Sequence, residues 1–140
     1  MKVSIIKQYS VFMPNRPGAL ARLAQLFGTA GVNIIGIASE VRDDSGLVRI
    51  ALDGEADQSA ILSRAGFASV ESKLLSIEVG DQPGQLADIT RVLAEGGINI
   101  TTVYGTAFGK ISRILVAVEK TEKALQILTE DLVNKPVTQA

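Results

Sequence analysis

The chain contains no cysteine, histidine or tryptophan among its 140 residues. Without histidine and cysteine it lacks the usual ligands of zinc and of soft metals. It also lacks the Ser-His-Asp and Cys-His groups of nucleophilic catalysis and the commonest proton-transfer side chain near neutral pH. No disulfide can form, which leaves the cytoplasm as the default compartment. We therefore expect neither a metal nor a cofactor.

The chain also lacks an excess of charge of either sign, and it lacks long apolar runs. The net charge is −1, so no basic field attracts nucleic acid or an anionic membrane, and neither is an expected partner. No run of about 18 apolar residues predicts a transmembrane helix, and the start of the chain predicts no signal peptide. Hydrophobic residues make up 46% of the chain, which is ample for a packed core.

What the sequence does contain is a repeat. The stretch Asn15-Arg16-Pro17-Gly18-Ala19-Leu20 returns 66 positions later as Asp81-Gln82-Pro83-Gly84-Gln85-Leu86. Gly31-Val32-Asn33-Ile34 returns at the same offset as Gly97-Ile98-Asn99-Ile100. A regular offset indicates successive copies of one structural unit, which we place at residues 1–71 and 72–140. A unit this small is marginal alone, so each half needs the other or a second chain, and we expect a homodimer.

Hydrophobic periodicity gives both copies one order of elements, because strands alternate and helices carry an apolar stripe. The first copy predicts strands at 6–13, 32–41, 47–52 and 67–71, and helices at 18–30 and 57–65. The second predicts strands at 73–79, 98–106 and 111–118, helices at 84–95 and 121–131, and a weak last strand at Pro136. The fold class is α+β: two ferredoxin-like βαββαβ units side by side, each an antiparallel sheet with its helices on one face.

A few side chains have predictable places in this scheme. Asn15 is a candidate N-cap of the first helix, and Gly31 suits the left-handed residue that ends it. Phe12 falls on the outward face of its strand and is expected to be covered by another element or subunit. Arg49 and Arg113 also face outward and are expected to be solvated or to form ion pairs.

The two motifs, N/D-x-P-G-x-L and G-[VI]-N-I, resemble those of the ACT domain, a regulatory module of amino-acid metabolism. The chain is most similar to stand-alone tandem ACT proteins, which have no catalytic domain. The resemblance implies a free amino acid bound at the interface between ACT units and a partner enzyme or regulator that responds to it. In serine-binding members the counterparts of Asn15 and Asn33 contact the effector, but those members carry a histidine where this chain has Met13.

The candidate ligand site therefore comprises both copies of the two motifs. A helix N-terminus suits a carboxylate, and glycine lets a ligand approach closely. The Asp81 carboxylate suits an α-amino group better than Asn15 does, whereas Asn33 and Asn99 could equally hold the loop. The candidate ligand-binding residues are Asn15, Arg16, Pro17, Gly18, Asn33, Ile34, Asp81, Gln82, Pro83, Gly84, Asn99 and Ile100.

Three other functions compete with amino-acid binding. A Pro-Gly turn is often only a turn, so the alternative is a protein-interaction subunit without a functional pocket. An enzyme is not expected, because the available acids form no repeated pair at one strand end; they are Glu40, Asp43, Asp44 and Asp81. An RNA-binding sheet is not expected either, since the strand Leu47–Leu52 has no aromatic stacking residues.

Overall fold

The computed structural model describes residues 1–53 and 56–134, which form six strands and four helices. In chain order these are β1 (Lys2–Pro14), α1 (Ala19–Thr29), β2 (Ile34–Arg42), β3 (Ser45–Leu52), α2 (Ser59–Arg64), β4 (Ala68–Gly80), α3 (Gln85–Glu95), β5 (Ile100–Phe108), β6 (Ile111–Val118) and α4 (Thr121–Asn134). The predicted last strand at Pro136 lies outside the described residues.

Contacts divide the chain into two compact units, of which one is interrupted in sequence. The N-terminal unit is Ile6–Ser72, and the C-terminal unit joins Met1–Ile5 to the chain from Lys73 onward. The boundary predicted after residue 71 assigns Met1–Ile5 to the first copy, whereas their contacts group them with the second.

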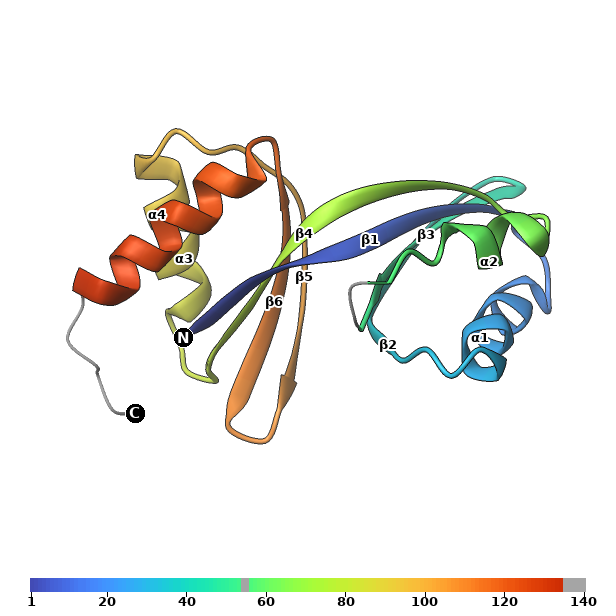
Figure 1. Cartoon of the computed structure of the whole chain (residues 1–140), viewed down its shortest axis with the longest axis horizontal. Coiled ribbons are helices and arrows are strands. Elements are labelled where there is room, and N and C mark those ends of the chain that lie inside the picture. The colour runs from blue at the N-terminus through green and yellow to red at the C-terminus, as the bar shows by residue number, and fades with distance from the viewer. Residues whose placement is uncertain (54–55, 135–140) are drawn as a thin grey trace. The chain divides into compact units, whose positions relative to one another are not determined.

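Both units have the ferredoxin-like strand arrangement that the sequence predicts. The hydrogen-bonded strands follow the order β2-β3-β1-β4-β6-β5. The N-terminal unit uses β2-β3-β1-β4, and the C-terminal unit uses β5-β6-β4-β1. In each unit the two helices cover one face of the strands (Figure 1). The α+β class and the duplicated βαββαβ plan are thus confirmed.

Each unit has its own hydrophobic core between its helices and its sheet. In the N-terminal unit Tyr9, Val11 and Ile50 of the strands are buried against Leu23 and Phe27 of α1. The core of the C-terminal unit contains the equivalent strand residues together with residues of α3 and α4: Leu75, Ile77, Ile114, Val116, Ile89, Leu93, Ala124 and Leu128. The same inward pattern in both copies is what the period of two along each strand predicts.

The strand that completes the C-terminal unit comes from the start of the chain. Val3 and Ile5 of β1 are half-buried and pack against the core of that unit. The predicted strand at 6–13 is therefore extended backwards to Lys2, and the predicted strands at 67–71 and 73–79 are one continuous strand, β4. β1 and β4 each contribute one segment to each unit.

The helix ends differ from those predicted at the start of α1 and in the length of α2. Asn15 is not the N-cap of α1: the cap is Gly18, which has φ 89° and provides no side-chain bond. Gly31 is left-handed at φ 71°, as expected. The helix predicted at 57–65 is shorter, because α2 spans only Ser59–Arg64.

On the sheet face away from the helices, the outward arginines form ion pairs, as expected. Arg49 pairs with Glu40 at 3.0 Å, and Arg113 pairs with Glu78. Phe12 keeps 51% of its surface exposed, so nothing within the described chain covers it fully. Ser76 alternates with the inward residues Leu75 and Ile77 and yet is only 7% exposed, because alternation along a strand sets direction and not burial.

Removing side-chain volume from Ile5 should destabilise the C-terminal unit, although the residues that follow Ile5 in sequence belong to the N-terminal unit. We expect Ile5→Ala to lower the free energy of unfolding by about 1–3 kcal/mol, below the full cost for a buried isoleucine, since Ile5 is only half-buried. Hydrogen exchange should accelerate in α3 and α4. Faster exchange confined to α1 would contradict the assignment of Met1–Ile5 to the C-terminal unit.

Candidate functional site

The Pro-Gly corners, residues 15–18 and 81–84, have the same backbone geometry in both units. The backbone N–H of Asn15 donates to the carbonyl oxygen of Asp44 at 2.8 Å, and the N–H of Asp81 donates to the carbonyl of Lys110 at 2.8 Å. Asp44 and Lys110 lie in the turns of the β2–β3 and β5–β6 hairpins. Each corner is therefore fastened to the neighbouring hairpin by a bond that does not depend on the side chain.

Each corner presents an open helix N-terminus. Gly18 and Gly84 cap α1 and α3 in the left-handed region, at φ 89° and 93°, and no side chain caps either helix. A helix leaves its first backbone N–H groups without intrahelical partners. A Cβ built on either glycine would meet nothing within 4 Å, so no neighbouring side chain fills the space at these two positions.

The polar side chains of the two corners bond to the hairpins. The Asn15 side-chain amide donates to the carbonyl oxygen of Asp43 at 3.1 Å. One oxygen of the Asp81 carboxylate accepts a hydrogen bond from the Ser112 hydroxyl at 2.7 Å. These bonds stabilise the corners. If Asn15 or Asp81 also bound a ligand, it would have both a structural and a binding role.

The other half of the predicted site forms what we call the bulge ends, residues 33–35 and 99–101. The carbonyl of Asn33 accepts from the N–H of Asp53 at 3.0 Å, and that of Asn99 accepts from the N–H of Glu119 at 3.4 Å. Directly after each asparagine the register shifts, between Ile34 and Gly36 and at the same place in the second copy. A β-bulge leaves backbone groups of the extra residue unpaired, and bulges are frequent beside binding sites.

Within one unit the corner and the bulge end lie at opposite ends of the sheet. Pro14, which precedes the first corner, pairs with Ser45 at the start of β3. Ile34 of the bulge end pairs with Leu52 at the other end of β3. These points are seven residue steps apart along the strand, or about 24 Å. The predicted residues of one unit therefore form two separate groups, and one amino acid cannot touch both groups of the same unit.

The charges around the two corners differ although the backbones match. Arg16 and Arg22 lie in and after the first corner, and α1 has no acid in its first turn. The second corner carries Asp81, and α3 has Asp88 in its first turn. Acids near a helix N-terminus compete with a bound anion for the same positive potential, so the first corner is the better anion site.

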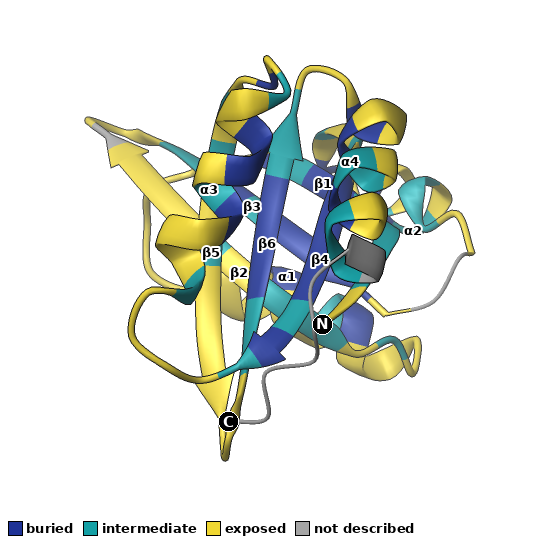
Figure 2. Ribbon diagram, turned by 90° about the vertical axis from the view of Figure 1, so that its left-hand side faces the viewer, coloured by how far each residue is buried: buried dark blue, intermediate teal, exposed yellow. Residues whose placement is uncertain are grey.

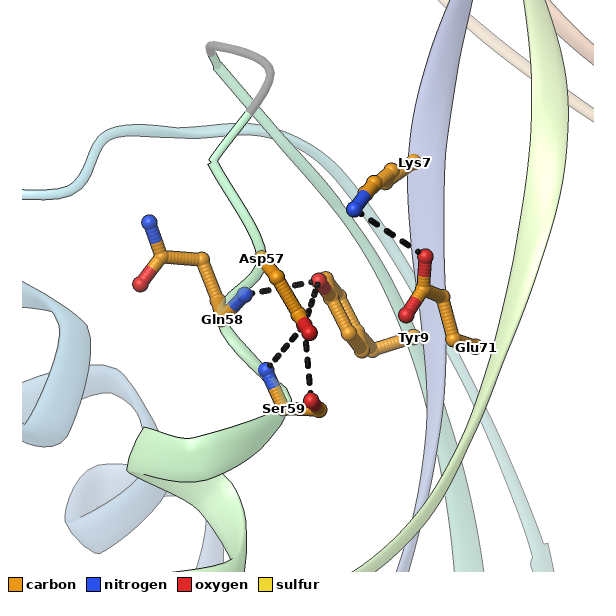
Figure 3. Close-up of polar contacts among 6 residues, drawn as sticks. All are labelled: Lys7, Tyr9, Asp57, Gln58, Ser59 and Glu71. Atoms are coloured by element: carbon orange, nitrogen blue, oxygen red, sulfur yellow. Dashed lines mark hydrogen bonds and ion pairs between the residues drawn. The ribbon is translucent and has the colours of Figure 1, made fainter.

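The side chain of Tyr9, in β1, reaches the start of α2 and joins a polar network there. The side chain of Tyr9 is fully buried, and its hydroxyl accepts from the N–H of Gln58 at 2.8 Å and donates to the Asp57 carboxylate at 3.3 Å. The same Asp57 oxygen accepts from the N–H and the hydroxyl of Ser59, at 2.9 and 2.7 Å (Figure 3). Lys7 and Glu71 form an ion pair at 3.2 Å on the adjacent strands.

This network is electrostatically consistent with a structural role. Burial raises the pKa of the Tyr9 phenol, which keeps it protonated. Hydrogen bonds from Ser59 lower the pKa of the Asp57 carboxyl. The second copy has Leu75 and Lys123 at the equivalent positions, so the network is confined to the N-terminal unit. The sequence signal that could have found it is Asp57-x-Ser59, a helix-start pattern beside a tyrosine whose hydroxyl needs a partner.

A shallow cleft of about 250 Å³ lies on the C-terminal unit, lined by Glu78, Thr106, Phe108, Ile111 and Arg113. The hydrogen bond from Arg113 lowers the pKa of Glu78, so the pair is charged at neutral pH. Phe108 is 88% exposed at its edge. None of the twelve predicted ligand-binding residues lines this cleft.

Within residues 1–53 and 56–134, no group of three acidic side chains is arranged to hold a metal ion. In that same part of the chain, every helix is too short or too polar to cross a membrane.

The fold and the duplicated corners define a tandem of small ferredoxin-like domains, and the family follows from the sequence. Residues 4–135 match the family model described as an ACT domain pair. The chain therefore belongs to the ACT domain pair family. No curated protein matches it.

Solved structures share this fold at low sequence identity. Protein BT0572 from Bacteroides thetaiotaomicron aligns with a TM-score of 0.85 and 21% identity, over 93% of this chain and 90% of that one. The ligand-free regulatory subunit of aspartate kinase from Thermus thermophilus aligns with a TM-score of 0.66 and 18% identity, over 93% and 96%. The corresponding subunit from Thermus flavus gives 0.56 and 18%, over 94% and 97%.

Loss of the Tyr9 hydroxyl oxygen should lower the stability of the folded chain by a measurable amount. Tyr9→Phe leaves the N–H of Gln58 without its acceptor and should lower the free energy of unfolding by about 1–3 kcal/mol. Because the pKa of Tyr9 is raised by folding, its contribution is complete below the unfolded pKa and is lost as the pH rises through the folded value. Urea titrations at neutral and at strongly alkaline pH measure both effects.

If Tyr9→Phe unfolds at the same urea concentration as the unchanged protein, the hydroxyl does not stabilise the start of α2.

Proposed function

We propose that this protein is a regulatory amino-acid sensor, which binds a free amino acid between two ACT units and so controls a partner enzyme or regulator in the cytoplasm. The observation that carries the proposal is the duplicated, uncapped helix N-terminus behind an open left-handed glycine. Its backbone N–H groups and the positive end of the helix dipole suit a carboxylate. The family membership agrees with this reading.

The separation of corner and bulge end within a unit determines how such a ligand would bind. An amino acid that contacts both motifs must lie between the corner of one unit and the bulge end of another. The carboxylate would bind at the corner, while unpaired carbonyl groups at the bulge would accept from the ammonium group. Binding would then favour one arrangement of units, which is how an effector biases a regulated partner.

Of the two corners, we propose that the first takes the carboxylate. Arg16 is exposed there, and no acid lies in the first turn of α1. At the second corner Asp81 and Asp88 lower the potential. The Asp81 carboxylate oxygen that does not bond to Ser112 suits the ammonium group of a ligand instead.

A second copy of the chain can supply the other unit, and the sheet offers edges for one. β2 and β5 are the outer strands of the order. β5 is nine residues long with no charged side chain, and Figure 2 shows it exposed along most of its length. Long edges without charges favour pairing with another chain. We therefore propose a homodimer.

The alternative function is a protein-interaction subunit whose corners bind nothing. The side-chain bonds of Asn15 and Asp81 to the hairpins favour it, because they give both residues a structural role. Ligand binding distinguishes the two functions directly.

A thermal-shift panel of the free amino acids tests the sensor. At millimolar concentration at least one amino acid should raise the unfolding midpoint, since a ligand that binds only the folded state stabilises it. Arg16→Glu should weaken the binding of that amino acid about tenfold, equivalent to about 1.4 kcal/mol, because it places an acid at the first corner. Isothermal titration calorimetry measures the change.

The control is Gln82→Glu, which places a glutamate at the equivalent position of the second corner; it changes the net charge by one unit, whereas Arg16→Glu changes it by two. Its affinity should stay within about twofold. Equal weakening by both variants would contradict the preference for the first corner, and a panel in which no amino acid shifts the midpoint would leave the interaction subunit as the function.

Sedimentation velocity tests the homodimer. Val103→Lys places a charge on the exposed edge strand β5 and should raise the dissociation constant of the dimer about tenfold or more. Val70→Lys, at an exposed position of the inner strand β4, is the control and should not. A monomer at all concentrations would contradict the proposed assembly.

A further inference from the structure

The N-terminal unit carries an open groove between α1 and α2, with a volume of about 430 Å³. Leu26, Ile61 and Phe67 line it with apolar surface, and Arg22 reaches it from α1. None of the described residues that line it belongs to the Pro-Gly corners or the bulge ends. The groove is therefore a second candidate site, built from different residues than the amino-acid site.

The second copy of the repeat shows why this groove is open. In the C-terminal unit Gly96, at the end of α3, lies so close to Ile127 of α4 that an added Cβ would come within 2.5 Å of the isoleucine side chain. The equivalent residues are Ala30 and Ile61, and both line the groove. Ala30 carries the Cβ for which that close contact leaves no space, so the gap between α1 and α2 stays open.

Arg22 is held in place at the groove by two contacts. Its guanidinium lies over the ring of Phe67, 4.5 Å from the centroid, and donates to the carbonyl oxygen of Ala65 at the end of α2. A guanidinium has five N–H donors, which bind a carboxylate in a planar fork. The bond to Ala65 uses one of them, so the fixed side chain still has donors for an anion.

Positive charge at this position is a property of the N-terminal unit. Arg22 is the one charged side chain among the described residues that line the groove, and neither α1 nor α2 contains an acid. In the second copy the position of Arg22 is taken by Asp88, which pairs with Arg91 at 3.8 Å. An anion is thus favoured in the first copy and disfavoured in the second.

The size and the lining of the groove limit what this anion can be. An apolar cavity of about 150 Å³ is large enough for benzene, so the groove has room for a ring and a short chain. Small-molecule sites are mostly apolar with a few precisely placed polar groups, which is the composition found here. Because a single guanidinium balances one negative charge, the matching ligand is a monocarboxylate with an apolar body the size of a phenyl ring.

We propose that the α1–α2 groove binds a small monocarboxylate, whose apolar body packs on Leu26 and Ile61 and whose carboxylate pairs with Arg22. Such a ligand needs no ammonium group, which distinguishes it from the free amino acid proposed above. The inference goes beyond the proposed function and does not depend on it, because the groove shares no residue with the corners or the bulge ends.

The probe is 3-phenylpropionate, and its neutral amide, 3-phenylpropionamide, has the same shape without the charge. Calorimetric titration of the full chain should show the acid binding about tenfold or more tightly than the amide, because charge-assisted hydrogen bonds are the stronger kind. In nitrogen-labelled protein, the acid should shift the amide resonances of Leu26, Thr29 and Ile61. The resonances of α3 should not move.

Matched variants separate the Arg22 fork from the general charge of the unit. Arg22→Gln should weaken binding of the acid about fivefold or more, whereas Arg64→Gln, which removes the same charge from α2 outside the groove, should change it less than about twofold. Ala30→Trp fills the groove from an exposed position and should abolish binding, which decides the matter if Arg22→Gln does not fold. Circular dichroism melts verify the fold of each variant.

The proposal is overturned if the acid and the amide bind equally, if the acid does not bind, if Arg64→Gln weakens binding as much as Arg22→Gln does, or if Ala30→Trp binds it normally. Shifts centred on Leu20 and Ala21, in the first turn of α1, would place the carboxylate at the first corner and would equally overturn it. The amino-acid panel and the Arg16→Glu variant test the sensor with different ligands, so the groove and the sensor can fail separately.

Discussion

The structure depends on two strands that each serve two cores. β1 and β4 are 13 residues long, about twice the usual length of a strand, and each contributes one segment to either unit. A unit of about 66 residues buries a smaller fraction of its surface than a larger domain does and is only marginally stable alone. Val3 and Ile5 supply apolar area to the C-terminal unit from the far end of the sequence.

Duplication has kept the backbone of the unit and changed its charges. Both copies keep the left-handed glycine at φ 89° and 93°, the bond from the corner to its hairpin and the register shift after the asparagine. These features use glycine and main-chain groups, which tolerate exchange of the neighbouring side chains. The side chains Arg16 and Arg22 of one copy are Gln82 and Asp88 in the other, so two corners of one backbone geometry carry different charges.

Much of the fold was predictable because the period of two along the strands and the apolar stripes of the helices are local properties. The order of elements, the inward strand residues and the left-handed Gly31 follow from them. The site was predictable only in its parts. That Asn15 bonds to Asp43 instead of capping α1, and that Tyr9 binds Asp57, depends on residues 28 and 48 positions away, which no local pattern specifies.

The sequence by itself determined that the chain is two copies of an ACT unit, because the offset of 66 residues repeats both the glycines and the apolar pattern. Only the tertiary structure decided that Met1–Ile5 complete the C-terminal core, and that the corner and the bulge end of one unit are a whole strand apart. The physical reason is the range of the interactions involved. Periodicity and turn chemistry act between near neighbours, whereas burial and hydrogen bonding join whatever the fold brings together.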